Sequence, residues 1–144
     1  MVNFEQLADE FSRRANNGQP ISRCDVLEIH PDRQEVWFIE DTNLTHPRNP
    51  VPLWEDDVFE KNFRENICKM WGSLVVWHWA RAISHPAIPV ANVDLSKFGL
   101  VYLLRFPALD ADQQLFLARP IKNLIEKLYR YRNGAFANVQ FIEK

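Results

Sequence analysis

Apolar residues recur at helical spacing in three segments of the chain. The first predicts an amphipathic helix over residues 3–16, because its apolar positions fall at i, i+3, i+4 and i+7. The second, a stripe that starts at Phe59 after an acidic first turn at Asp56-Asp57, predicts a helix to about Ala82. It is so rich in apolar positions that neighbouring elements should cover most of it. The third predicts a helix with Pro120 in its first turn, ending at Asn133-Gly134. The three stripes are Phe4, Leu7, Ala8, Phe11; Phe59, Phe63, Ile67, Met70, Leu74, Trp77; and Leu117, Ile121, Leu124, Ile125, Leu128.

Four shorter apolar runs predict β-strands. Residues 23–30 and 35–42 flank a turn-forming segment, Pro31-Asp32-Arg33-Gln34, and together predict a hairpin. Residues 100–106 and 137–142 predict two further strands. The stretch from Asn43 to Asp57 holds three prolines and no periodicity, so we expect an irregular crossover there.

These elements predict a single α/β domain over residues 1–144, in the order helix, hairpin, helix, strand, helix, strand. A hairpin joins antiparallel strands, whereas a strand, helix, strand succession makes a parallel crossover. We therefore expect a mixed central sheet flanked by helices.

The charge distribution is uneven along the chain. Residues 1–58 carry 5 basic and 12 acidic residues, whereas residues 59–144 carry 12 basic and 7 acidic ones. One interpretation is that the two parts attract each other in the fold. The other is that the basic part contacts phosphates, since the last helix interleaves its basic residues with Tyr129 and Tyr131. Those basic residues are Arg119, Lys122, Lys127, Arg130 and Arg132.

The cysteines and histidines show no metal-binding spacing. Cys24 and Cys68 fit neither a disulfide framework nor a zinc motif, and we expect each to be a small buried hydrophobe. His78 stands between Trp77 and Trp79 and is expected in the core.

The sequence also favours a cytoplasmic location without membrane association. The N-terminal residues are acidic and amphipathic, unlike a secretory signal. The most apolar stretch, residues 70–83, is interrupted by His78 and Arg81 and is too short to span a bilayer.

Two carboxylates mark the candidate site. Glu40 ends a strongly apolar run, where an uncompensated charge is costly, and shares a strand face with Thr42. Asp25 lies in the other arm of the predicted hairpin, beside Glu40. Two carboxylates, with backbone oxygen and water, are suitable ligands for Mg²⁺. Alternatively, Asp25 only begins a strand and Glu40 pairs with Arg23 or Arg105.

The element order and the segments Cys24-Asp25-Val26-Leu27-Glu28 and Val36-Trp37-Phe38-Ile39-Glu40-Asp41-Thr42 resemble the PD-(D/E)XK nuclease superfamily. The resemblance covers about residues 3–106 and implies the restriction-endonuclease-like fold. It implies that Asp25 and Glu40 are catalytic and bind Mg²⁺, and that nucleic acid is the substrate. The position of the family's catalytic lysine is taken by Thr42, which supplies no charge.

Lys69 is the candidate to replace that lysine. It lies in the second predicted helix on a polar face that includes Asn62, Glu65, Asn66 and Ser73. The alternative is that Lys69 belongs to a solvated helix face. The first helix offers further acids, Glu5, Asp9 and Glu10, with the same alternative.

The sequence leaves two functions open, and with them the question whether the chain is an enzyme. The first is a nuclease-like domain associated with nucleic acid, inactive or partner-dependent because Thr42 replaces the lysine. The second is a non-catalytic interaction or dimerisation module. Its surface for a second copy or a partner protein would be formed by Trp71, Trp77 and Trp79, with Trp54.

Overall fold

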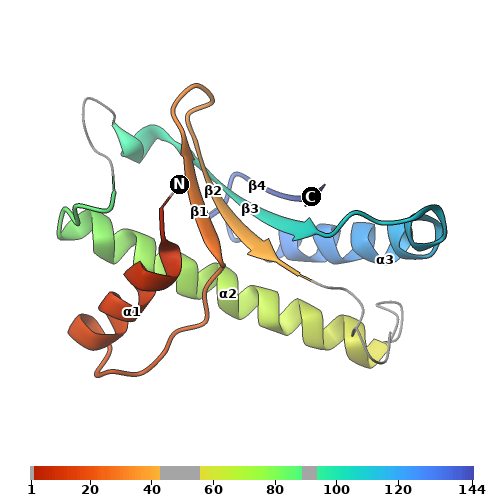
Figure 1. Ribbon diagram of the computed structural model, residues 1–144, viewed down its shortest axis with the longest axis horizontal. Helices are drawn as coiled ribbons and strands as arrows, with labels where there is room; N and C mark the ends of the chain where they lie inside the picture. The colour runs from red at the N-terminus through yellow and green to blue at the C-terminus, as the bar shows by residue number, and fades with distance from the viewer. Residues whose placement is uncertain (1, 43–55, 89–93) are drawn as a thin grey trace.

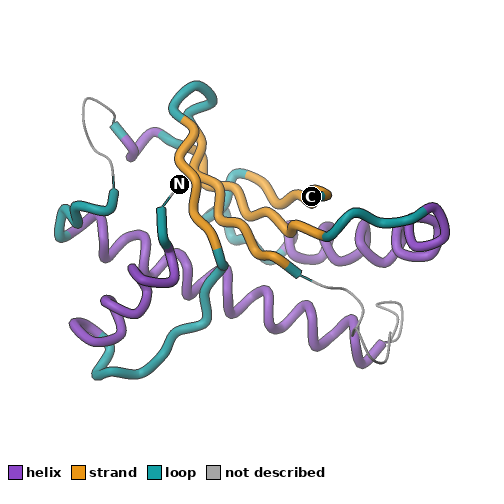
Figure 2. Tube along the Cα trace, viewed as in Figure 1, coloured by secondary structure: helices purple, strands orange, loops and turns teal. Residues whose placement is uncertain are grey.

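The computed structural model describes residues 2–42, 56–88 and 94–144 as an α/β structure with a four-stranded mixed sheet (Figures 1 and 2). The predicted order of elements is confirmed. The helices are α1 (Phe4–Ala15), α2 (Asp56–Ala82) and α3 (Ala111–Arg130), with a short 3₁₀ helix η1 (Leu95–Lys97). The strands are β1 (Val26–His30), β2 (Glu35–Asp41), β3 (Gly99–Phe106) and β4 (Asn138–Glu143).

The strands follow their chain order across the sheet. β1 and β2 form the antiparallel hairpin, while β3 lies parallel to β2 and β4 parallel to β3. The helices α2 and α3 lie between the parallel strands in sequence and supply the crossovers. The prediction of a mixed sheet is therefore confirmed.

All three helices pack on one face of the sheet, and the main core lies between them (Figure 1). Alternate strand residues such as Phe38 and Tyr102 enter this core. On the other face, Ile39, Val101 and Leu103 form a smaller buried cluster with Trp37 beside it. Side chains of β2 therefore alternate between the helix-covered core and the opposite face of the sheet.

The long helix α2 ends at Ala82, as predicted. Ser84 has a left-handed φ of 53°, and the chain turns so that the His85 amide donates to the Ala80 carbonyl at 2.8 Å. Pro86 follows, and a proline there disfavours further helix. Within the part of the chain that the structure describes, no helix is long and apolar enough to cross a membrane.

Several sequence-based boundaries are corrected by the structure. β1 begins at Val26 rather than Arg23, whereas α2 begins at Asp56, where the sequence predicted an acidic first turn. Pro120 lies inside α3 rather than in its first turn. The buried Leu117 precedes the proline, and this packing holds the chain helical despite a missing backbone donor.

The exposure of α2 differs most from expectation. Cys68 and His78 were expected to be buried, but both are exposed, and one face of the helix is left uncovered. α1 and α3 each contact α2 but cover only part of its circumference. Most of the predicted crossover, including Trp54, lies outside the described residues.

Candidate active site

The hairpin places Asp25 and Glu40 opposite each other. The β1–β2 register pairs Val26 with Ile39, and the Asp25 amide donates to the Ile39 carbonyl at 2.9 Å. One residue beyond this pair, Asp25 and Glu40 therefore face each other across the two strands. Both side chains point to the helix-covered side of the sheet, since Leu27 and Phe38, two residues away on each strand, enter the main core. The structure thus brings the two predicted carboxylates together.

The carboxylate of Asp25 is held in place yet remains accessible. Its Oδ2 accepts a hydrogen bond from the Asp41 amide at 2.9 Å, and its Oδ1 lies 3.8 Å from the Arg23 guanidinium. Arg23 also lies 3.4 Å from Glu5 of α1, so it bridges α1 and the hairpin. The Asp25 side chain is still 41% exposed, which leaves it open to a ligand from solvent.

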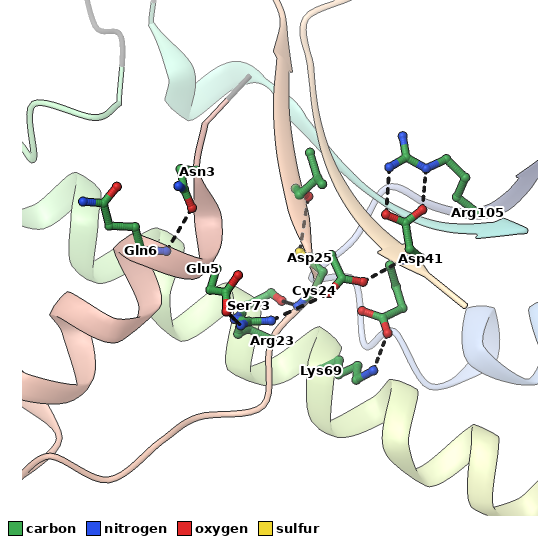
Figure 3. A network of polar contacts seen from close by, with 12 residues as sticks. Asn3, Glu5, Gln6, Arg23, Cys24, Asp25, Asp41, Lys69, Ser73 and Arg105 are labelled. Atoms are coloured by element: carbon green, nitrogen blue, oxygen red, sulfur yellow. Dashed lines mark hydrogen bonds and ion pairs between the residues drawn. The ribbon is translucent and has the colours of Figure 1, made fainter. Parts of the chain in front are cut away.

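Lys69 reaches the same place from α2. Its ammonium donates to Oε1 of Glu40, forming a partly buried ion pair between the helix and the end of β2. Figure 3 shows Lys69 extending from α2 toward the hairpin, with Asp25 and Asp41 close by. Arg23 and Arg105 pair with Asp25 and Asp41 rather than with Glu40, which excludes the two arginine pairings considered for Glu40.

Asn66, Lys69 and Ser73 of the polar face of α2 lie toward the sheet, whereas Glu65 is exposed and pairs with Lys61 at 4.0 Å. Asn66 and Ser73 are buried, one turn before and one turn after Lys69. Ser73 Oγ accepts a hydrogen bond from the Cys24 amide at 2.8 Å, and Asn66 Oδ1 accepts one from the Tyr102 hydroxyl at 2.8 Å. These residues fix α2 against β3 and against the segment that enters β1. The helical spacing of the stripe was visible in the sequence, but its direction was not.

Burial makes Glu40 an unusual carboxyl group. Its side chain is almost fully buried, which raises its pKa from 4.5 to about 7, although the Lys69 ammonium acts in the opposite direction. The nearby Asp25 carboxylate raises the pKa further, by like-charge repulsion. Oε2 of Glu40 is buried and has no hydrogen-bond partner among the residues described. Such an atom is costly unless a ligand compensates it.

The remaining polar neighbours of the carboxylates are neutral. Burial raises the pKa of the Cys24 thiol to about 12 and that of the Tyr102 hydroxyl well above 10.0. Both groups therefore stay protonated at physiological pH. The charge of the site comes from Asp25, Glu40 and Lys69, with Arg23 at its rim.

Other candidates lie elsewhere or have structural partners. Thr42 directly follows β2, and its amide donates to the Arg105 carbonyl at 3.0 Å. Glu10 pairs with His85 at the far end of α2. Lys127 of α3 binds Glu60 at 2.6 Å, and the guanidinium of Arg132, just after the helix, stacks on Tyr129. These contacts stabilise the fold, whereas Arg119, Lys122 and Arg130 are exposed on α3.

The residues present suit a hard divalent cation with few protein ligands. Mg²⁺ typically uses one or two carboxylates and retains several waters. Asp25 offers Oδ1, and Glu40 offers Oε2, which has no hydrogen-bond partner in the described part of the chain. No group of three or more His, Cys, Asp or Glu residues suited to a metal occurs within residues 2–42, 56–88 and 94–144, so a larger protein-only cage is not formed there.

Comparison with known proteins adds no relative. No protein-family model matches the chain, and no significant match occurs among curated proteins or solved structures.

Proposed function

We propose that this chain hydrolyses phosphodiester bonds in nucleic acid, as a nuclease-like domain whose lysine comes from helix α2 instead of strand β2. The observation that carries the proposal is the contact of Lys69 with Glu40 beside Asp25. It supplies the cation that Thr42 lacks. The element order and the mixed sheet support the restriction-endonuclease-like fold that this proposal requires.

Each residue has a distinct role in the proposed reaction. Asp25 and Glu40 would hold Mg²⁺, which supplies Lewis-acid stabilisation of the phosphodiester and a more acidic bound water. Lys69 places a positive charge next to the reacting phosphate, where it donates hydrogen bonds to the oxygens on which negative charge develops. Without metal Glu40 has a pKa of about 7, so Mg²⁺ would compete with its proton near neutral pH. The Asp41 amide and Arg23 keep Asp25 oriented.

The test is cleavage of single-stranded and double-stranded DNA and RNA with Mg²⁺ or Mn²⁺. We expect activity in the wild type and a loss of about 100-fold or more in Asp25→Asn and Lys69→Met. Binding of Mn²⁺, followed by titration calorimetry, should weaken in Asp25→Asn. This second readout does not depend on turnover.

Matched controls separate chemistry from folding. Glu28→Gln alters a carboxylate of β1, three residues after Asp25. The Glu28 side chain lies on the opposite face of the sheet, where it forms a hydrogen bond of 3.0 Å with His30. Lys97→Met alters an exposed lysine of η1. Both controls should cleave as the wild type does. Absence of cleavage with both metals and every nucleic acid, or equal loss in Glu28→Gln, would refute the proposal.

A further inference from the structure

Arg23 lies at the rim of the candidate active site, and its contacts there are loose. Its guanidinium is 3.4 Å from Glu5 and 3.8 Å from Asp25, and its side chain is 23% exposed. Figure 3 shows Arg23 between these two carboxylates. Both distances exceed the about 2.7–3.2 Å of an N–H···O hydrogen bond. Arg23 therefore keeps hydrogen-bond donors for a further partner.

Arg105, on the other face of the sheet, is a contrasting case. Its guanidinium donates two hydrogen bonds of 2.6 and 2.9 Å to Asp41, which is the paired contact that arginine makes with a carboxylate. A phosphate offers two oxygens in a similar geometry. Arg23 has the donors for such a pair, but within the described part of the chain no carboxylate lies as close to it as Asp41 lies to Arg105.

The backbone next to Arg23 is fixed, although the side chain is not. The Cys24 amide donates to Ser73 Oγ at 2.8 Å, and the Asp25 amide donates to the Ile39 carbonyl at 2.9 Å. These bonds anchor the segment to α2 and to β2. A side chain carried by an ordered backbone loses less conformational entropy when it binds a ligand.

The tryptophans of α2 do not form the joint surface that the sequence predicted. Trp77 is fully buried, and Trp79 packs against Phe11 with the ring centroids 5.5 Å apart. Of these three tryptophans only Trp71 is largely exposed, at 41%. A single exposed ring offers no charge to a phosphate, whereas the rim of the candidate active site offers Arg23.

We propose that Arg23 binds a phosphate of the nucleic acid at this site, donating two hydrogen bonds to its non-bridging oxygens. This inference rests on the proposed function, which places a phosphodiester beside Asp25. Arg23 turns from Asp25 to the phosphate, while the Asp41 amide, at 2.9 Å, continues to hold the Asp25 carboxylate. Glu5 competes only weakly for Arg23, because its side chain is 70% exposed and such ion pairs contribute little.

The test is the affinity for short labelled DNA and RNA, single-stranded and duplex, by fluorescence anisotropy with Ca²⁺ in place of Mg²⁺. Arg23→Met should weaken binding about tenfold or more. It should also lower the slope of log Kd against log salt concentration by about 0.9 for duplex DNA, the value of one phosphate contact. Arg23→Lys keeps the charge but not the planar fork, so it should keep the slope and weaken binding only a few-fold.

Two matched variants separate phosphate binding from the bridge between α1 and the hairpin. Glu5→Gln breaks that bridge, yet it should bind at least as tightly as the wild type because a competing carboxylate is removed. Arg13→Met removes an exposed cation of α1 and should leave the affinity unchanged. Circular dichroism should show every variant folded. Calorimetry should show that Arg23→Met binds Mn²⁺ no more weakly than the wild type, since Asp25 keeps its bond from the Asp41 amide.

Wild-type affinity and salt slope in Arg23→Met, or an equal loss of affinity in Glu5→Gln or Arg13→Met, would overturn the phosphate role. Weaker Mn²⁺ binding by Arg23→Met would also overturn it, because Arg23 would then act only by orienting Asp25. A wild type that binds through Arg23 but cleaves no nucleic acid would refute hydrolysis alone. A wild type that cleaves, with Arg23→Met binding equally well, would refute this inference alone, and a wild type that binds neither DNA nor RNA would refute both.

Discussion

Two neighbouring residues of β2, Glu40 and Asp41, each pair with a cation, but on opposite faces of the sheet. Glu40 turns toward the helices, where its own side chain is almost fully buried and its partner Lys69 is 32% exposed. Asp41 turns to the other face, where Arg105 binds it through two hydrogen bonds of 2.6 and 2.9 Å and Lys144 lies at 3.4 Å. The pKa of Glu40 is raised to about 7, whereas the Arg105 guanidinium lowers the pKa of Asp41.

The difference shows that an ion pair does not by itself reveal the state of a carboxylate. Asp41 keeps partial contact with water and has two cations, so its charge is stabilised. Among the residues that the structure describes, Glu40 has one cation, a nearby carboxylate and a buried oxygen without a hydrogen-bond partner. The protein therefore stabilises the Asp41 pair fully and leaves the Glu40 pair incompletely satisfied, which is typical of a functional site.

The largest expected effect is a difference in cleavage activity between variants of Glu40 and of Asp41. Glu40→Gln should reduce metal-dependent cleavage by about 1,000-fold, since it removes a ligand oxygen and the partner of Lys69. Asp41→Asn should stay within a few-fold of wild type. Initial cleavage rates at saturating metal would measure both. Equal losses would show that the two pairs do not differ in function.

The next effect concerns stability against pH. Below about pH 4.5 Glu40 is protonated in both the folded and unfolded states. Between pH 4.5 and about 7 the unfolded chain loses this proton first, so stability falls as pH rises and then levels off. The pKa shift corresponds to about 3 kcal/mol of unfolding free energy.

Glu40→Gln tests directly whether Glu40 causes this fall of stability with rising pH. The variant should lack this decline and should be more stable than wild type at pH 8, by about 2–3 kcal/mol, despite the lost pairing with Lys69. Urea denaturation at pH 5 and pH 8 would measure the difference. A variant with the same pH slope as wild type would assign the decline to another group.

A smaller effect is expected for the polar stripe that positions α2. Ser73→Ala leaves the buried Cys24 amide without its acceptor, which should lower the unfolding free energy by about 1–3 kcal/mol. Ser96→Ala, at an exposed site in η1, should have little effect. Chemical denaturation of both variants provides the comparison, and equal stabilities would show that the bond is dispensable.

The smallest effect is expected for the unfolding free energy when Asp41, on the sheet face away from the helices, is changed. Asp41→Asn weakens an ion pair whose side chains are 25–31% exposed, and it should cost about 1 kcal/mol or less near pH 7. Because the folded pKa of Asp41 is lowered, the contribution is present above the ordinary value of 3.8 and is lost as pH falls further. Thermal melts between pH 3 and pH 7 would detect it.

The sequence predicted the elements well where local signals were strong. The two short apolar runs around the turn at Pro31 predicted the hairpin, and the apolar stripe predicted α2 with its end at Ala82. The placement of Asp25 and Glu40 in facing arms also followed from the sequence, because a hairpin has few possible registers. The prediction for Pro120 was wrong because α3 already begins at Ala111. A proline marks the start of a helix only when tertiary packing does not hold the residues before it in a helix.

Tertiary structure decided which faces are covered and what the polar residues meet. The spacing of Asn66, Lys69 and Ser73 is the same whether the stripe faces water or a sheet. Only the packing of α2 under β2 and β3 turned it inward, and the same packing left Trp71 and His78 outside. Local preferences depend on residues a few positions apart, whereas burial of a helix face depends on contacts between segments far apart in the chain.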